Sequence, residues 1–122
     1  MALPRSLQLT LRAEQALLGL GAAAAFIWLG YGWLTFLLLV LLPDLSMLGY
    51  LVGPRVGAIT YNAAHTWLTP IALAALAFLG FAWALPAALI FAAHIGIDRA
   101  IGYGLKLPTG FKDTHLGAIG PT

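Results

Sequence analysis

Apolar residues occupy long runs in this sequence, and the polar residues between them define four predicted helices. The runs cover residues 13–29, 33–51, 56–79 and 84–104. Each is close to the ~20 residues of helix that cross the ~30 Å hydrocarbon core of a bilayer. The connections are short, so consecutive helices should be antiparallel. The pattern therefore predicts an all-α fold, an integral membrane four-helix up-down bundle that forms a single domain.

Glycines support this division of the chain. Gly30 and Gly32 flank an aromatic residue after the first run, and glycines in this arrangement favour a turn. Joining residues 13–42 into one tilted helix would instead give three spans, and these two glycines argue against it. Residues 105–122 are polar and rich in glycine and proline. We expect them to form a tail beyond the last helix.

Composition and charge placement favour a lipid environment. Of the 122 residues, 61% are hydrophobic and 8% are charged, whereas about 25% of residues in soluble domains are charged. Basic residues flank the helix ends on the side of the two termini, and the turns at 30–32 and 80–83 carry no charge. Positive charge collects on the cytoplasmic side, so both termini of this multi-pass protein should be cytoplasmic. Without cysteine, thiolate chemistry is excluded, and no nucleic-acid motif is present.

Five polar residues inside the apolar runs are predicted to lie at one depth. They are Asp44, Asn62, His65, His94 and Asp98. Counted from the helix ends near the termini, they lie roughly 9–15 Å along their helices, at ~1.5 Å per residue. The spacings of three between Asn62 and His65, and of four between His94 and Asp98, put each pair on one helix face. Ionisable groups inside membrane helices are costly and usually mark function, so we expect a shared pocket shielded from lipid.

The side chains in this layer are typical of a metal site. Imidazoles and carboxylates are ligands that Zn²⁺, Mn²⁺ and iron accept, which makes Asp44, His65, His94 and Asp98 the predicted ligands of a divalent metal. Helical bundles with inward carboxylates and histidines form such sites. Asp98 could instead accept a hydrogen bond from a ligand histidine. The whole group could also be a hydrogen-bond network without an ion. Asn62 is expected to touch substrate or to support the ligands.

Three residues near the tail are further candidates. Asp113 and His115 lie beyond the last helix and could fold back over the pocket as catalytic acid–base groups; the alternative is an ordinary solvated tail. Arg99, next to Asp98 in the sequence, either reaches anionic headgroups or binds an anionic substrate.

The polar motifs together resemble a known family. They are Leu42-Pro43-Asp44-Leu45-Ser46, Tyr61-Asn62-Ala63-Ala64-His65-Thr66, Ala93-His94-Ile95-Gly96-Ile97-Asp98-Arg99 and Phe111-Lys112-Asp113-Thr114-His115. Over residues 13–118 the chain resembles a small bacterial integral-membrane family of unknown function. The resemblance implies membership and a location in the bacterial inner membrane, and it brings no established activity.

A more distant similarity is to membrane-bound metal-dependent hydrolases. Those proteins carry a Pro-Asp, then a His-Thr or His-Ser, then a His followed four residues later by Asp. The matching positions here are Pro43-Asp44, His65-Thr66, and His94 with Asp98. Where the hydrolases commonly place further Asp and His residues, this chain has Leu45-Ser46. The similarity implies metal-dependent hydrolysis.

Three functions are therefore open. A metal-dependent hydrolase would lower the pKa of a bound water toward ~7 and act on a lipid-like or amphiphilic substrate from the cytoplasmic leaflet. His65 and His94 could instead be axial ligands of a b-type haem, although the neighbouring acids argue against this. A proton-relay or transport subunit is the third function. Four helices are few for transport, so a transporter would have to be a homo-oligomer such as a homodimer. A structural subunit of a larger membrane complex is a further alternative.

Overall fold

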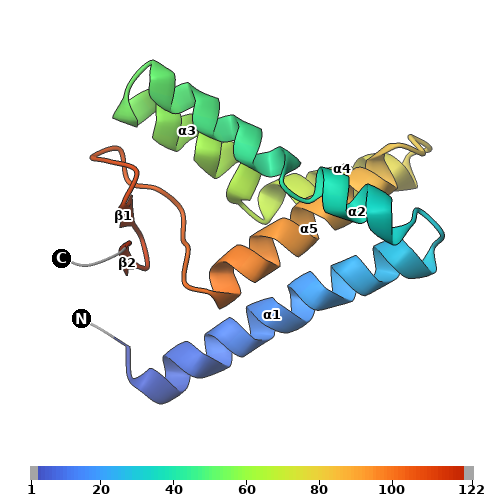
Figure 1. The fold of residues 1–122 in the computed structure, drawn as a ribbon, viewed down its shortest axis with the longest axis horizontal. Helices are drawn as coiled ribbons and strands as arrows, with labels where there is room; N and C mark the ends of the chain where they lie inside the picture. The colour runs from blue at the N-terminus through green and yellow to red at the C-terminus, as the bar shows by residue number, and fades with distance from the viewer. Residues whose placement is uncertain (1–2, 120–122) are drawn as a thin grey trace.

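The computed structural model describes residues 3–119, which form helices and one short hairpin (Figure 1). The elements are α1 (Arg5–Trp28), α2 (Trp33–Leu39), the 3-10 helix η1 (Leu42–Leu51), α3 (Pro54–His65), α4 (Leu68–Phe78), α5 (Ala84–Ala100), β1 (Asp113–Thr114) and β2 (Gly117–Ala118). In Figure 1, α1 leads away from the end that holds both termini, α2 and η1 return, α3 and α4 lead away again, and α5 returns. The predicted all-α class is confirmed.

The predicted helix over residues 33–51 is divided at Pro43. α2 ends at Leu39, and η1 begins at Leu42 with proline in its first turn. Proline has no N–H and its ring clashes with the carbonyl four residues earlier. The chain therefore winds more tightly, and the N–H of Asp44 donates to the carbonyl of Leu41 at 3.0 Å. Pro43 predicts a kink in this helix just before Asp44, and the structure has one there as a change from α-helix to 3-10 helix.

The predicted helix over residues 56–79 is also divided. α3 ends at His65, Thr66 is extended with φ −88° and ψ 145°, and α4 begins at Leu68. Pro70 explains the break, because its ring would clash with the carbonyl of Thr66 if the helix continued. The expectation of one continuous helix over residues 56–79 was therefore wrong. The break leaves His65 at the C-terminal end of a helix in the middle of the molecule.

The first and last helices differ from the prediction at their ends. α1 begins at Arg5 rather than at residue 13. α5 ends at Ala100 rather than near residue 104, because Gly102 has φ 99° and reverses the chain. The N–H of Tyr103 then donates to the carbonyl of Asp98 at 2.8 Å, which is a Schellman ending. α5 therefore stops two residues after Asp98.

α5 is the central helix, and its closest neighbour is α1. A Cβ atom added at Gly96 would lie 2.5 Å from the backbone nitrogen of Gly19, so the two backbones touch where the helices cross. Small residues at such a crossing permit close packing. α5 also packs against α4, and η1 packs against α3. This arrangement places η1, the end of α3 and one face of α5 around a common interior.

Most large apolar side chains face outward. Phe78 is 92% exposed and Leu51 is 86% exposed. Within residues 3–119, one helical stretch, Trp33–Leu51, is long and apolar enough to cross a membrane, and only 6% of it is buried. A core helix of a soluble protein would be mostly buried, although an N-terminal signal sequence can pass the same test. One possible span is weak evidence for a membrane location, and the multi-pass topology stays a prediction.

The tail folds back onto the helices. β1 pairs antiparallel with β2, and Lys106 forms an isolated bridge with Thr114. The side chain of Asn62 in α3 both donates to the carbonyl of Lys106 at 2.8 Å and accepts from its N–H at 2.6 Å. Residues 105–119 therefore cover one end of the bundle. The last three residues of the predicted tail lie outside the described residues.

Candidate metal centre

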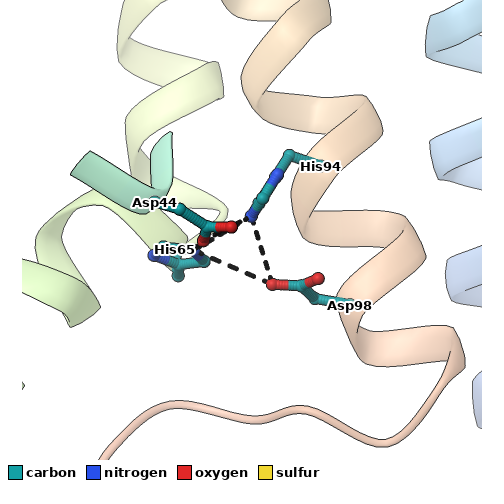
Figure 2. A group of neighbouring side chains, drawn as sticks. All are labelled: Asp44, His65, His94 and Asp98. Atoms are coloured by element: carbon teal, nitrogen blue, oxygen red, sulfur yellow. Dashed lines mark hydrogen bonds and ion pairs between the residues drawn. The ribbon is translucent and has the colours of Figure 1, made fainter. Parts of the chain in front are cut away.

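Four predicted ligand residues meet in the interior of the bundle. Asp44 comes from η1, His65 from the last residue of α3, and His94 and Asp98 from one face of α5 (Figure 2). One ligand atom from each residue lies within 4.8 Å of all the others. Both imidazoles are buried, at 3% and 4% exposure. Residues up to 54 positions apart in the sequence thus form one group, which we call the Asp/His cluster.

The contacts in the Asp/His cluster are short. The Nε2 atoms of the two histidines are 3.1 Å apart. Oδ1 of Asp44 lies 3.1 Å from Nε2 of His65 and 3.0 Å from Nε2 of His94. Oδ2 of Asp98 lies 3.7 Å and 3.3 Å from the same two nitrogens. Both carboxylates therefore point toward the two Nε2 atoms, and the four groups surround one small space.

The other nitrogen of each ring fixes the proton positions. Nδ1 of His65 donates to the carbonyl of Tyr61 at 2.8 Å, and Nδ1 of His94 donates to the carbonyl of Val40 at 2.6 Å. A carbonyl can only accept, so each neutral ring carries its proton on Nδ1 and a lone pair on Nε2. Backbone carbonyls occupy the Nδ1 sides of both rings. Asp98 therefore faces the Nε2 lone pairs and does not accept a hydrogen bond from the Nδ1–H of a ligand histidine.

This arrangement gathers four acceptors that require a cation. Two imidazole lone pairs and two carboxylate oxygens point at one another without a hydrogen-bond donor between them when the rings are neutral. A tetrahedral ion with metal–ligand bonds of about 2.0–2.1 Å separates its ligand atoms by about 3.3 Å. Five of the six separations between ligand atoms are 3.0–3.7 Å and bracket this value, and the sixth, between Asp44 and Asp98, is within 4.8 Å. The cluster could hold a metal ion by this geometry.

Haem does not fit the same geometry. Two axial histidines lie on opposite sides of the iron, so their Nε2 atoms are roughly twice a metal–nitrogen bond apart, about 4 Å, with a porphyrin plane between them. Here the two Nε2 atoms are 3.1 Å apart, and the carboxylates of Asp44 and Asp98 occupy the space beside them. We therefore do not retain haem as an alternative.

The two helix breaks are stabilised by residues of α5. The carbonyl of Val40, at the junction of α2 and η1, accepts from His94. The carbonyl of His65, at the end of α3, accepts from the guanidinium of Arg99 at 3.1 Å. Free carbonyls in an apolar interior are costly unless they are satisfied. Arg99, which was predicted to bind headgroups or substrate, thus uses one of its N–H groups to cap α3.

A cavity of about 160 Å³ adjoins the Asp/His cluster. Its lining residues are Asp44, Met47, Tyr61, Asp98, Tyr103, Lys106, Phe111 and Ile119. Lys106 is 4% exposed, and its ammonium lies 3.9 Å from the ring centre of Phe111 and 4.8 Å from that of Tyr61. Burial lowers the pKa of Lys106, and the carboxylates of Asp98 and Asp44 oppose that effect.

Sequence reasoning missed Lys106 as a residue of this site. Lys106 stood out only as a basic residue near a helix end, and nothing in its local sequence indicates a buried position. The two hydrogen bonds from Asn62 place it, because they hold its backbone against α3. Asn62 was predicted to support the ligands or touch substrate. In the structure it holds the backbone of Lys106, which lines the cavity.

The structure does not bring Asp113 and His115 to the Asp/His cluster. Oδ2 of Asp113 accepts from the hydroxyl of Thr109 at 2.7 Å, and Nδ1 of His115 accepts from the N–H of Leu105 at 2.8 Å. Neither residue lines the cavity beside the cluster. Their predicted catalytic roles have no support in this geometry.

Comparison with known proteins identifies the family. The profile of a domain of unknown function, DUF4260, matches residues 8–119, and the chain therefore belongs to this family. No curated protein and no solved structure matches it. The predicted membership in an uncharacterised family is confirmed, and the predicted similarity to metal-dependent hydrolases is not shown.

Proposed function

We propose that this member of the DUF4260 family is a membrane-embedded metal protein that binds one divalent ion through Asp44, His65, His94 and Asp98. The observation that carries the proposal is the convergence of two Nε2 lone pairs and two carboxylate oxygens within 4.8 Å. A buried polar group without a partner is costly. A positive ion between these four atoms satisfies all of them at once.

A proton is the alternative cation, and the ligand geometry favours a metal over it. One proton on an Nε2 atom, donated to a carboxylate, satisfies two of the four acceptors and leaves the second imidazole without a donor of its own. A second proton would satisfy the remaining pair, but it would place two imidazolium cations with their Nε2 atoms 3.1 Å apart. Both Nδ1–H groups are fixed on backbone carbonyls, a device that orients metal-binding histidines. Mixed nitrogen and carboxylate ligands without thiolate suit Zn²⁺, Mn²⁺ or Fe²⁺.

Membrane embedding is supported by the exposed apolar surface. Side chains such as Leu51 and Phe78 are almost fully exposed, and a soluble monomer rarely exposes extended apolar patches. Lipid on all sides of the bundle would cover them. The basic residues near the termini then favour cytoplasmic N- and C-termini. We propose the bacterial inner membrane as the location, with the hairpin end facing the cytoplasm.

The cavity beside the Asp/His cluster favours hydrolysis as the reaction. A bound metal would polarise a substrate or activate a water there. The cavity of about 160 Å³ has room for a small reacting group, and the ammonium of Lys106 lies at its wall. A positive group in a desolvated site stabilises an oxygen that gains negative charge. We propose that the substrate is lipid-like or amphiphilic, because the bundle presents apolar surface around the site.

Metal content tests the first part of the proposal. The full-length protein, purified in maltoside detergent without added chelator, should carry one Zn, Mn or Fe per chain by elemental analysis. Asp44→Asn, which keeps the side-chain volume, should lose the metal. The matched variant Asp113→Asn should keep it, because Asp113 bonds to Thr109 outside the cluster. A wild-type protein that stays metal-free after incubation with each of the three ions would refute the proposal.

Hydrolysis is tested with chromogenic probes. Bis-p-nitrophenyl phosphate and p-nitrophenyl decanoate represent phosphodiesters and amphiphilic esters. We expect metal-dependent turnover of one of them, loss of turnover in Asp44→Asn, and a raised KM in Lys106→Met. Equal turnover in the wild type, Asp44→Asn and the chelated protein would show that contaminants hydrolyse the probes. Absence of turnover in a metal-loaded protein would refute the hydrolase assignment and leave the metal site standing.

A further inference from the structure

A second, larger cavity lies at the end of the bundle that holds the termini, apart from the Asp/His cluster. Its volume is about 650 Å³, within the range of small-molecule sites. Its lining residues come from the first turns of α1, the end of α5 and the tail hairpin, and Figure 1 shows these segments at the end of the bundle that holds the termini. None of the four cluster residues lines it. We call it the basic cleft, because its basic lining residues are Arg12, Arg99 and His115.

The basic cleft presents hydrogen-bond donors from three elements. A guanidinium has five N–H groups. Arg12 uses its Nε–H on the carbonyl of Ala100 at 2.5 Å, and Arg99 uses one N–H on the carbonyl of His65. Within residues 3–119 neither guanidinium makes a further hydrogen bond, and both side chains line the cleft. No carboxylate is among its lining residues within the described part of the chain.

Two further side chains are oriented as donors by their other hydrogen bonds. Nδ1 of His115 accepts from the N–H of Leu105 at 2.8 Å, so the neutral ring carries its proton on Nε2. Oε1 of Gln15 accepts from the indole of Trp67 at 2.9 Å, which leaves the amide NH₂ of Gln15 as the group free to donate. Both residues line the cleft.

We propose that the basic cleft binds a phosphate group, carried by a soluble phosphoester or by a phospholipid headgroup. No carboxylate lines the cleft beside the two guanidinium groups, which favours an anion as the ligand, and arginine forks match phosphate oxygens in pairs. Leu3, Leu11 and Leu116 line the same cleft and would contact the apolar part of such a ligand. The cleft is separate from the metal centre, so its ligand does not depend on a bound ion.

Inorganic phosphate is the first probe. The full-length protein in phosphate-free maltoside solution is titrated with phosphate and followed by calorimetry. We expect saturable binding to the wild type, at least tenfold weaker binding to Arg99→Gln and to His115→Gln, and binding within twofold of wild type for Arg55→Gln. The last variant is a matched control, because Arg55 carries the same charge and does not line the cleft. Circular dichroism confirms that each variant is folded.

Lipid binding distinguishes the two sources of phosphate. Native mass spectrometry compares retention of phosphatidylglycerol with that of diglucosyl diacylglycerol, which has the same acyl chains and no phosphate. Selective retention of phosphatidylglycerol, weakened by Arg99→Gln, assigns the cleft to headgroups. Phosphate binding without selective lipid retention assigns it to a soluble phosphoester.

The proposal can be overturned without affecting the metal site. If phosphate and phosphatidylglycerol both fail to bind, or if Arg55→Gln weakens binding as much as Arg99→Gln, the cleft is not a phosphate site. Asp44→Asn separates the two sites. It should lose metal and keep phosphate binding, and loss of phosphate binding in this variant alone would place the anion on the metal instead.

Discussion

Removal of the metal should destabilise the wild-type protein and leave Asp44→Asn almost unaffected. In the metal-free protein the carboxylates of Asp44 and Asp98 lie within 4.8 Å of each other. Two ionised carboxylates at that distance repel by at least about 3.5 kcal/mol at an effective dielectric constant of about 20. Lys106 lines the cavity with both acids and offsets part of this repulsion. We expect this to reduce the net cost to about 2 kcal/mol.

That cost corresponds to a fall in Tm on the order of 8 °C for a domain of this length. The assay is thermal unfolding in detergent, followed by near-ultraviolet circular dichroism, before and after treatment with EDTA and after return of Zn²⁺, Mn²⁺ or Fe²⁺. In Asp44→Asn one of the two charges is gone, so EDTA should shift Tm by less than about 2 °C. Asp113→Asn should respond as the wild type does. A wild-type Tm that changes neither with EDTA nor with added metal would refute metal binding by the Asp/His cluster.

Three further predictions concern packing, the tail and the basic cleft. Gly96→Ala should destabilise the bundle by about 1–3 kcal/mol, because its Cβ would meet the backbone of α1. Gly21→Ala, whose Cβ would have open space, should be neutral or slightly stabilising in chemical denaturation. Asn62→Ala removes both hydrogen bonds to the backbone of Lys106, so trypsin should cleave after Lys106 several times faster than in the wild type. Burial and a neighbouring guanidinium lower the pKa of His115 from its ordinary value, which favours the neutral ring. Bound phosphate should raise the NMR titration midpoint of His115, and an unchanged midpoint at saturating phosphate would contradict its place in the cleft.

The sequence alone determined the helical class and the members of the Asp/His cluster. Within long apolar runs, a helix satisfies the backbone N–H and C=O groups by hydrogen bonds inside the same segment. Ionisable residues inside such runs need partners. The spacing of four between His94 and Asp98 puts both on one helix face. Counting residues from the helix ends indicated a similar depth for Asp44 and His65, although the count assumed α-helical rise where the structure has the 3-10 helix η1.

Tertiary structure decided everything that depends on contacts between elements. Pro43 and Pro70 are visible in the sequence, yet the breaks they cause persist because His94 and Arg99, on another helix, satisfy the freed carbonyls. The position of Lys106 follows from its pairing with Asn62. The spacing of residues that share one helix face is a local property, so a sequence pattern can show it. A carbonyl or an ammonium, by contrast, finds its partner only after distant segments have packed.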